Sequence, residues 1–152
     1  MISEIKPITT SDTLAIRHKV MWPEKPFDFV KLPNDKMARH FGLFVNEELV
    51  SIISLFAEDN EAQFRKFATL HKFQGLGYGT ILLKNIVDLV EQDGFKKIWC
   101  NARVEKSKFY ERFGFKLTDK TYMKGGIEFV IMEKIFTLKD SESLLSNDKL
   151  NS

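Results

Sequence analysis

Hydrophobic residues recur along the chain in short alternating runs, interrupted by stretches with helical spacing. The alternation of apolar and polar positions predicts seven β-strands, at residues 2–6, 41–45, 49–57, 62–70, 97–101, 115–122 and 127–135. Residues 79–92 differ, because their apolar members fall at the i, i+4, i+7 and i+8 positions of one helical face, namely Leu82, Ile86, Leu89 and Val90. The pattern therefore predicts a sheet with a long helix that has one buried side.

Two further helices are expected. Thr9 and Asp12 have the spacing of a capping box, which predicts a helix from this point through about Val20. A shorter helix is predicted over residues 105–113. Because the helix at 79–92 lies between two strands, we expect a right-handed crossover between parallel neighbours, while strands joined by short turns should be antiparallel. The sequence thus predicts an α/β fold of the α+β type, with a mixed, mostly antiparallel sheet.

Composition favours a single domain with a polar tail. With 152 residues and 43% hydrophobic content, the chain can bury roughly 70% of its unfolded surface without disulfides or metals. We expect residues 1–136 to form the domain and residues 137–152 to be a mobile tail. A net charge of +2 gives no argument for nucleic acid, and no apolar run approaches the ~18 residues that span a bilayer, so we expect a cytoplasmic protein. No metal site is expected, because His18, His40 and His71 have no partners at zinc spacing.

A glycine-rich loop lies between the strand at 62–70 and the helix that follows it. Its sequence is Gln74-Gly75-Leu76-Gly77-Tyr78-Gly79-Thr80. Glycines let the main chain approach an anion closely, and the first N–H groups of a helix supply donors at its positive end. Thr80 stands where a dinucleotide-binding motif would have its third glycine, and no lysine follows the glycines as in a nucleotide P-loop. The sequence therefore predicts a pyrophosphate site of another kind.

A second motif lies further along the chain. Its sequence is Phe109-Tyr110-Glu111-Arg112-Phe113-Gly114-Phe115, and it begins 30 residues after Gly79. The two motifs together, in this order and at this separation, resemble the coenzyme A loop and the later aromatic segment of the GNAT superfamily of N-acetyltransferases. The resemblance covers about residues 62–135. It implies a GNAT fold with a parallel, splayed strand pair, helices on both faces of the sheet, and acetyl-CoA as cofactor.

The resemblance also implies roles for particular residues. Main-chain groups of Phe67 and Thr69 would pair with the acetyl carbonyl and the pantetheine arm, and Arg103 stands where many members carry an asparagine that contacts the cofactor. The pyrophosphate would be held by the loop residues Gln74, Gly75, Leu76, Gly77, Tyr78, Gly79 and Thr80. Tyr110 would lie near the thioester sulfur. A phenol with a pKa of about 10 is protonated at neutral pH and can protonate a departing thiolate, so Tyr110 is the candidate catalytic acid.

The candidate base is less well defined by the sequence. Gln63 stands eleven residues before Gln74, where the histone-type branch of the family has a catalytic glutamate, and an amide cannot accept the proton. An acidic group near a turn, Glu58, Asp59 and Glu61, offers an alternative base acting through water. Two other interpretations stay open at this stage. Tyr110 could be a core aromatic, and the protein could be a non-catalytic acyl-CoA-binding module.

The acceptor is expected to be a primary amine on a small molecule or a peptide. We expect it to be acetylated by direct attack on the thioester. Residues from the proline-marked region after the first helix should help to wall its site, namely Trp22, Phe27, Phe29, Asp35 and His40. These mixed aromatic and charged types suit several amine classes equally. The oligomeric state is open, and a dimer is compatible with the sequence.

Overall fold

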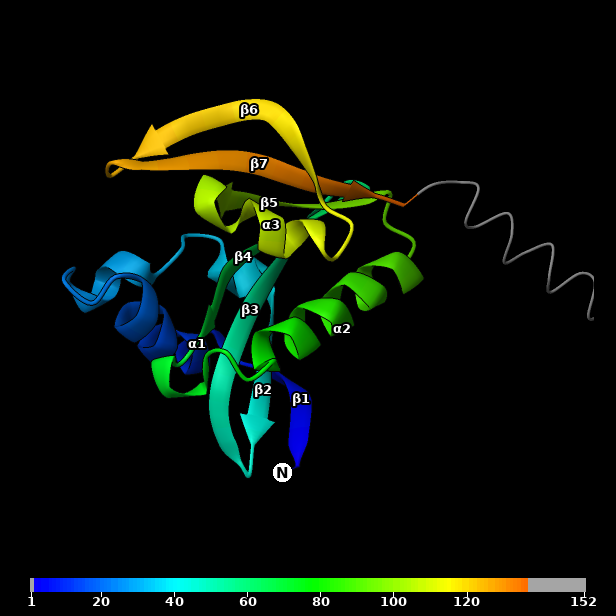
Figure 1. Ribbon diagram of the computed structural model, residues 1–152. Coiled ribbons are helices and arrows are strands. Elements are labelled where there is room, and N and C mark those ends of the chain that lie inside the picture. The colour runs from blue at the N-terminus through cyan, green and yellow to red at the C-terminus, as the bar shows by residue number, and fades with distance from the viewer. Residues whose placement is uncertain (1, 137–152) are drawn as a thin grey trace, which may run out of the picture.

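One seven-stranded sheet organises residues 2–136, which are the residues that the computed structural model describes (Figure 1). Its strand order is β1-β2-β3-β4-β5-β7-β6. The strands are β1 (Ser3–Ile8), β2 (Arg39–Val45), β3 (Glu48–Glu58), β4 (Glu61–Thr69), β5 (Lys97–Arg103), β6 (Lys116–Lys124) and β7 (Ile127–Ile135). All neighbours are antiparallel except β4 and β5, which are parallel. The predicted mixed and mostly antiparallel sheet is therefore confirmed.

Helices cover both faces of this sheet (Figure 1). The helix α2 (Tyr78–Gln92) buries its apolar side in the main core, with Leu82, Leu83, Ile86, Val87 and Val90 all buried. The short helix α3 (Ser107–Glu111) packs against the same core. On the opposite face, α1 (Thr10–Ile16) contributes Ile16 to a smaller cluster with Ile52 and Ala68. The α/β architecture with helices on both faces thus agrees with the expectation.

The first helix differs from its prediction at the end. Its start is as expected, because Thr9 Oγ1 accepts from Asp12 N at 3.2 Å and Asp12 Oδ2 accepts from Thr9 N at 3.0 Å. However, the α-helix ends at Ile16 and continues as a π-helical turn over Arg17–Met21. This wider turn carries a fully buried Arg17, whose side chain binds a later loop. Loop residues that are distant in sequence therefore determine the geometry here, so local spacing alone could not predict it.

The other elements match their predictions within a few residues. The helix expected over 105–113 is divided into a 3-10 turn (Val104–Lys106) and α3. Short 3-10 turns also occur at Phe27–Val30, Asp35–Met37 and His71–Phe73. The tail expected over 137–152 lies outside the described residues, and so does Met1. Within residues 2–136, no helix is long and apolar enough to cross a membrane.

The parallel strands β4 and β5 pair only at their beginnings. Glu61, Ala62 and Gln63 of β4 face Lys97, Ile98 and Trp99 of β5 in the ladder. Beyond this point β4 stays paired with β3, while β5 stays paired with β7 as far as Arg103. The later halves of β4 and β5 consequently share no ladder pair within the described residues. An edge of unpaired main-chain groups can accept an extended ligand as an added strand.

Candidate functional site

The glycine loop adopts the backbone that its sequence predicts. After β4 the chain makes the 3-10 turn His71–Phe73 and then enters α2, with Gly77 as the residue that precedes the helix. Gly75 and Gly77 have φ values of +77° and +89°, in the left-handed region that favours glycine. A Cβ atom added at either position would meet no atom within 4 Å. The loop therefore presents bare main chain to open space.

Several main-chain donors in this loop are available to a ligand. Within the described residues, no hydrogen bond engages the N–H groups of Gly75, Leu76, Gly77, Gly79 and Thr80. The first intrahelical bond at this end runs from Ile81 N to Gly77 O at 3.1 Å. Because α2 is 15 residues long, its aligned peptide dipoles add positive potential at this end. The donor set fits a diphosphate group, as the loop sequence predicted.

Gln74 stabilises the loop through two hydrogen bonds. Its side-chain Nε2 donates to the carbonyl of Thr69 at 2.9 Å, and its main-chain N donates to His71 O at 3.2 Å. Ser51 supports the same strand end from β3, since its hydroxyl lies 2.9 Å from Thr69 Oγ1 and donates to Ala68 O at 3.2 Å. Among the predicted loop residues, Gln74 therefore fixes the loop to β4, while the residues that follow it carry the open donors.

A basic groove adjoins the start of α2. It has a volume of about 510 Å³ and lies between α2, the end of α3 and β7. Thr80 and Lys84 line it from α2, Arg112 and Gly114 from the end of the α3 region, and Lys134 from β7. None of these three cations forms an ion pair within the described residues. Asp88 also lines the groove, but three cations against one carboxylate leave it net positive beside the anion-binding loop.

Tyr110 lies in an aromatic cluster that borders the divided part of β4 and β5. Its ring centroid is 5.8 Å from that of Phe64, 5.2 Å from Phe109 and 6.1 Å from Phe115. Burial raises the pKa of its phenol strongly, and the neighbouring charge of Arg103 opposes this rise. No hydrogen bond engages the hydroxyl within the described residues. Tyr110 thus combines core packing with a protonated hydroxyl that has no partner here.

Tyr110 packs on core rings although it does not share the helical face of Phe109 and Phe113, because successive residues of a helix point about 100° apart. Its contacts are with the nearly buried rings of Phe64 and Phe115. Helical spacing describes which residues share a face, but it does not show that a bend after Gly114 brings Phe115 back onto the tyrosine.

The structure brings the strand residues to the glycine loop. A Cβ atom added at Gly79 would lie 3.3 Å from the Phe67 ring and 3.4 Å from Thr69 Oγ1, so the loop packs directly on β4. Phe67 in turn stacks on Phe109 with centroids 6.3 Å apart. Phe67, Thr69, the loop and α3 therefore border one region, in which Arg103 acts electrostatically on Tyr110.

Other sequence candidates lie elsewhere. Glu58 and Asp59 are at the β3–β4 turn, and Glu61 forms an ion pair with Lys97 at 2.8 Å. This turn is at the start of β4, whereas the glycine loop follows its end, about 25 Å away at ~3.3 Å per residue. Gln63 sits at the last β4–β5 ladder pair, opposite Trp99. The acidic group is consequently remote from the glycine loop.

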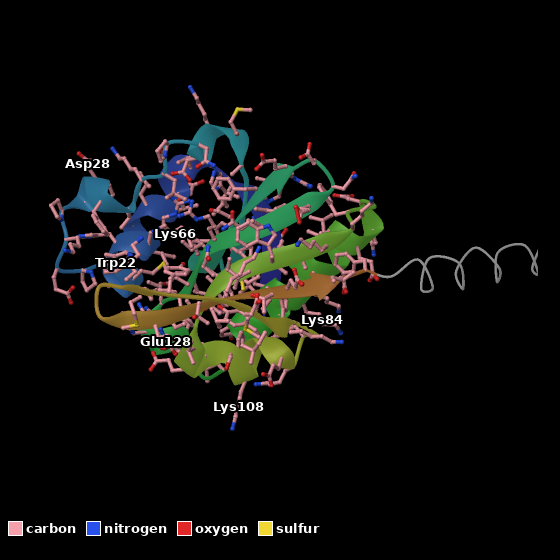
Figure 2. The ribbon with its side chains drawn as sticks, turned by 90° about the horizontal axis from the view of Figure 1, so that it is seen from above. Trp22, Asp28, Lys66, Lys84, Lys108 and Glu128 are labelled. Atoms are coloured by element: carbon pink, nitrogen blue, oxygen red, sulfur yellow. The ribbon has the colours of Figure 1, made fainter. Side chains whose placement is uncertain are left out.

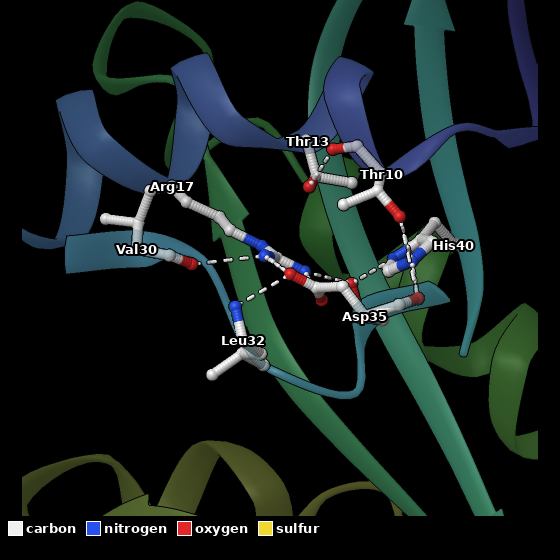
Figure 3. Close-up of polar contacts among 8 residues, drawn as sticks. Thr10, Thr13, Arg17, Val30, Leu32, Asp35 and His40 are labelled. Carbon is white, nitrogen blue, oxygen red and sulfur yellow. Dashed lines mark hydrogen bonds and ion pairs between the residues drawn. The ribbon is translucent and has the colours of Figure 1, made fainter. Parts of the chain in front are cut away.

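A buried polar network, which we call the Arg17 clamp, holds the N-terminal segments on the sheet (Figure 3). Arg17 donates from Nη1 and Nη2 to both carboxylate oxygens of Asp35, at 2.9 and 2.8 Å. It also donates to Val30 O at 3.1 Å and to Ser54 Oγ at 2.9 Å. His40 completes the network, with Nδ1 at 2.7 Å from Ser54 Oγ and Nε2 at 2.8 Å from Asp35 O.

The clamp changes the interpretation of two predicted wall residues. Asp35 and His40 are buried in it, so they position the loop after α1 and are not exposed to an acceptor. Burial raises the pKa of Asp35, but hydrogen bonds from Arg17 and from Leu32 N, the latter at 2.8 Å, outweigh burial and hold this pKa below its usual value. Arg17 Nε is the one buried side-chain N or O atom in residues 2–136 without a hydrogen-bond partner.

The remaining predicted wall residues, Trp22, Phe27 and Phe29, belong to an aromatic patch on the same side of the sheet as the Arg17 clamp. Trp22 and Phe29 meet edge to face with centroids 5.2 Å apart, and His18 and Phe27 do so at 5.5 Å. Phe27 and Phe29 stay exposed by 47% and 44%. Exposed aromatic rings held by the Arg17 clamp are available to contact a bound molecule.

Lys66 is the residue that the sequence interpretation missed. It lies in a β-bulge of β4 with a φ of +56°, which is uncommon for any residue other than glycine. Burial, followed by the charges of Arg65, Arg17 and Lys124, lowers its pKa to about 8, and Asp35 acts in the opposite direction. The sequence does contain a signal of this bulge. Phe64 and Phe67 are three residues apart, so they interrupt the alternation of apolar and polar residues along the strand.

Comparisons with known proteins give a consistent result. The model of the acetyltransferase (GNAT) domain family matches residues 22–136. YitI of Bacillus subtilis (strain 168), named as an uncharacterized N-acetyltransferase, is 29% identical over 148 residues, which span 91% of this chain and 98% of YitI. The ribosomal protein bS18-alanine N-acetyltransferase of Haemophilus influenzae is 26% identical over 98 residues, or 62% of this chain and 67% of that enzyme.

A solved structure supports the same fold. The GNAT family acetyltransferase from Elizabethkingia anophelis, determined with acetyl-CoA bound, superposes with a TM-score of 0.68 at 18% identity, and the match covers 88% of this chain and 98% of that one. Together with the family match over most of the described residues, the glycine loop and the divided strand pair lead to one conclusion. The chain belongs to the GNAT family of acetyltransferases and is an acyltransferase enzyme.

Proposed function

We propose that this protein transfers the acetyl group of acetyl-CoA directly to a primary amine. The observation that carries the proposal is the position of the open main-chain donors beside the divided part of β4 and β5, which Tyr110 borders. These donors belong to Gly75, Leu76, Gly77, Gly79 and Thr80. Acetyl-CoA, the co-substrate of the family, supplies an activated acyl group and a thiolate leaving group. The residues of this chain would bind it, orient it and provide a proton.

The binding residues follow from the available groups. Main-chain N–H groups at Gly75, Leu76, Gly77, Gly79 and Thr80 would hold the pyrophosphate. The basic groove with Lys84, Arg112 and Lys134 would receive the phosphate on the ribose. The β4 edge near Phe67 would pair with the pantetheine arm as an added strand. Arg103 is close enough to Tyr110 for its charge to act on the phenol, so it would lie near the arm's reactive end.

Direct transfer requires two proton movements. A neutral amine would attack the thioester carbonyl, so that a C–N bond forms, the C–S bond breaks, the nitrogen loses one proton and the sulfur gains one. Tyr110 would supply the proton to sulfur, because its raised pKa keeps the phenol protonated. Glu61 is already engaged by Lys97 at 2.8 Å, and Glu58 and Asp59 lie at the β3–β4 turn, so none of them is assigned as the base. Solvent would take the proton from the amine.

Amine-dependent thiol release from acetyl-CoA tests the proposal. A panel of small amines and peptides should include at least one that releases thiol in equal amount to N-acetyl product. The mass of the protein should stay unchanged after incubation with acetyl-CoA alone, because no covalent enzyme intermediate forms. An acetylated protein that passes its acetyl group to the amine would contradict direct attack. Binding of coenzyme A without turnover of any amine would favour a non-catalytic module instead.

A further inference from the structure

The bulge at Lys66 is a specific feature of the strand beside the proposed active site. Ile52 pairs with Ala68 and Ser54 pairs with Arg65, so the two residues Lys66 and Phe67 oppose the single residue between them on β3. Lys66 takes the left-handed conformation, which is strained for a side chain with a Cβ atom. Bulges are over-represented next to active sites, where they re-aim a side chain or end the pairing of a strand, and strained residues cluster there too.

Lys66 carries an uncompensated charge in a half-buried position. No ion pair or hydrogen bond engages its ammonium within residues 2–136. Cations dominate its surroundings, since the charges of Arg65, Arg17 and Lys124 all act on it. Asp35 is the carboxylate that acts on it, and this carboxylate is already engaged by both terminal nitrogens of Arg17. A partly desolvated ammonium of this kind is costly unless an anion joins it.

The position of Lys66 links it to the acceptor side. The strand β4 contacts the π-helical segment Arg17–Met21 on the face opposite to α2. Figure 2 labels Lys66 beside the blue N-terminal segments, on the side of the sheet where Trp22 is labelled. Lys124, at the end of β6, also acts on its charge. Lys66 therefore lies on the side of the sheet that carries the aromatic patch, on the strand whose later half borders the proposed cofactor.

Neighbouring side chains extend the positive surface. The guanidinium of Arg65 lies 5.9 Å from the Phe56 ring centroid and is near enough to Tyr122 to oppose the rise in its pKa that burial causes. Arg65 and Lys124 form no ion pair within the described residues. Two aromatic rings thus lie near Arg65, and the charges of Arg65 and Lys124 both act on Lys66. A ligand with a negative group and an apolar body matches these surroundings.

We propose that Lys66, with Arg65 and Lys124 beside it, selects an acceptor that carries a carboxylate in addition to the primary amine to be acetylated. This inference rests on the proposed function, because it identifies the substrate class of the same site. The carboxylate pairs with the Lys66 ammonium and thereby positions the amine. The carboxylate can belong to a free amino acid or to an acidic side chain near a peptide N-terminus, and the experiment separates these two sources.

Matched acceptor pairs test the proposal. One pair is L-phenylalanine and L-phenylalaninamide, and the other is a short peptide beginning Ala-Glu and the same peptide beginning Ala-Gln. The unmodified protein should acetylate the acidic member of at least one pair with a kcat/KM at least tenfold above that of the neutral member. Lys66→Met should reduce this preference to less than threefold, by raising KM for the acidic acceptor, while kcat for the neutral acceptor changes little.

Two variants make the result interpretable. Lys66→Gly removes the charge and suits the φ of +56°, so this variant should stay folded and lose the preference as Lys66→Met does. Lys96→Met removes an exposed lysine just before β5, at the end of that strand remote from Arg103, and should retain the preference in full.

Three outcomes would overturn the inference. The first is an unmodified protein that does not prefer the acidic member of either pair. The second is a Lys66→Met variant that slows acidic and neutral acceptors by the same factor, because Lys66 would then act on the reaction and not on the carboxylate. The third is acetylation of other amines but of no member of either pair. Failure of coenzyme A to bind, by contrast, would contradict the proposed function itself.

Discussion

At the scale of single residues, Tyr110 carries the proposed chemistry. Tyr110→Phe keeps the ring and its contacts with Phe64 and Phe115 but removes the proton donor. We expect kcat to fall by about 10² to 10⁴, the usual contribution of a general acid, with little change in KM or in stability. A coenzyme A thiol, if it ionises like a free cysteine at a pKa of about 8.5, leaves fairly readily without a proton, so the low end is expected. Steady-state kinetics and thermal unfolding of the variant check this. A variant that turns over like the parent would make Tyr110 a core aromatic only.

The ionisation of Lys66 gives a pH dependence. Burial and the charges of Arg65, Arg17 and Lys124 lower its pKa to about 8, against the opposing charge of Asp35. Lys66 therefore carries its positive charge below about pH 8 and loses that charge above it. The preference for an acidic over a neutral acceptor should be full near pH 7 and decline as the pH rises toward 9.

The ratio of the two kcat/KM values is the appropriate readout, because kcat/KM reports the free enzyme. The peptide pair serves for this measurement, because both of its members carry the same N-terminal alanine amine, so ionisation of that amine largely cancels in the ratio. The phenylalanine pair does not serve, because a free α-carboxylate and an α-amide give the amine different pKa values. In Lys66→Met the ratio should not change with pH. A ratio in the parent that stays constant from pH 7 to 9 would show that Lys66 does not control the preference.

At the scale of elements, the glycine loop should bind coenzyme A through its backbone. Gly77→Val introduces a side chain at a φ of +89° and into open space that a phosphate would need. We expect coenzyme A affinity, measured by titration calorimetry, to fall at least tenfold. Gly94→Val is the matched control, because Gly94 has a φ of +86° and equally open surroundings at the other end of α2. Equal affinity loss in both variants would attribute the effect to backbone strain and not to the site.

The Arg17 clamp predicts a separation of effects. Arg17→Met leaves the buried Asp35 carboxylate without its partner, so we expect the free energy of unfolding to fall by about 3 to 5 kcal/mol. Arg39→Met breaks an exposed pair with Asp93, 3.2 Å apart, and should cost no more than about 1 kcal/mol. Denaturant unfolding measures both.

The clamp also positions the aromatic patch but lies on the opposite face from α2. In the folded Arg17→Met variant, KM for the acceptor should therefore rise while coenzyme A affinity stays within about twofold. A comparable loss of coenzyme A affinity would contradict the assignment of the clamp to the acceptor side.

The order and type of the elements followed from local sequence, whereas their irregularities did not. The alternating strands, the capping box at Thr9 and Asp12, and the apolar face of α2 are local signals that the structure keeps. The π-helical turn at Arg17 depends on Asp35, 18 residues away, and no local pattern encodes that pairing. The bulge at Lys66 is signalled in the sequence by the three-residue spacing of Phe64 and Phe67. The charges that act on Lys66, however, come largely from other segments, which carry Arg17, Asp35 and Lys124.

At the scale of the whole molecule, the two proposed sides of the site differ in how much local sequence says about them. The glycine loop and the segment around Tyr110 are each short continuous motifs, and their resemblance to the GNAT family, not their spacing, implied that they meet. The proposed acceptor side would combine the segment after α1, the bulge of β4 and the end of β6. Two of its predicted wall residues, Asp35 and His40, belong instead to the buried clamp. Long-range assembly of this kind cannot be deduced from residue types along one stretch.

The central claim is that the loop after β4 and the gap between β4 and β5 together hold acetyl-CoA with its sulfur at Tyr110. A crystal structure of the complex with coenzyme A tests it most directly. The account predicts pyrophosphate oxygens at about 3 Å from main-chain nitrogens of the Gly75–Thr80 segment, the pantetheine arm alongside β4, and the thiol sulfur in contact with Tyr110 Oη. Coenzyme A bound away from this segment, or with its sulfur remote from Tyr110, would contradict the account.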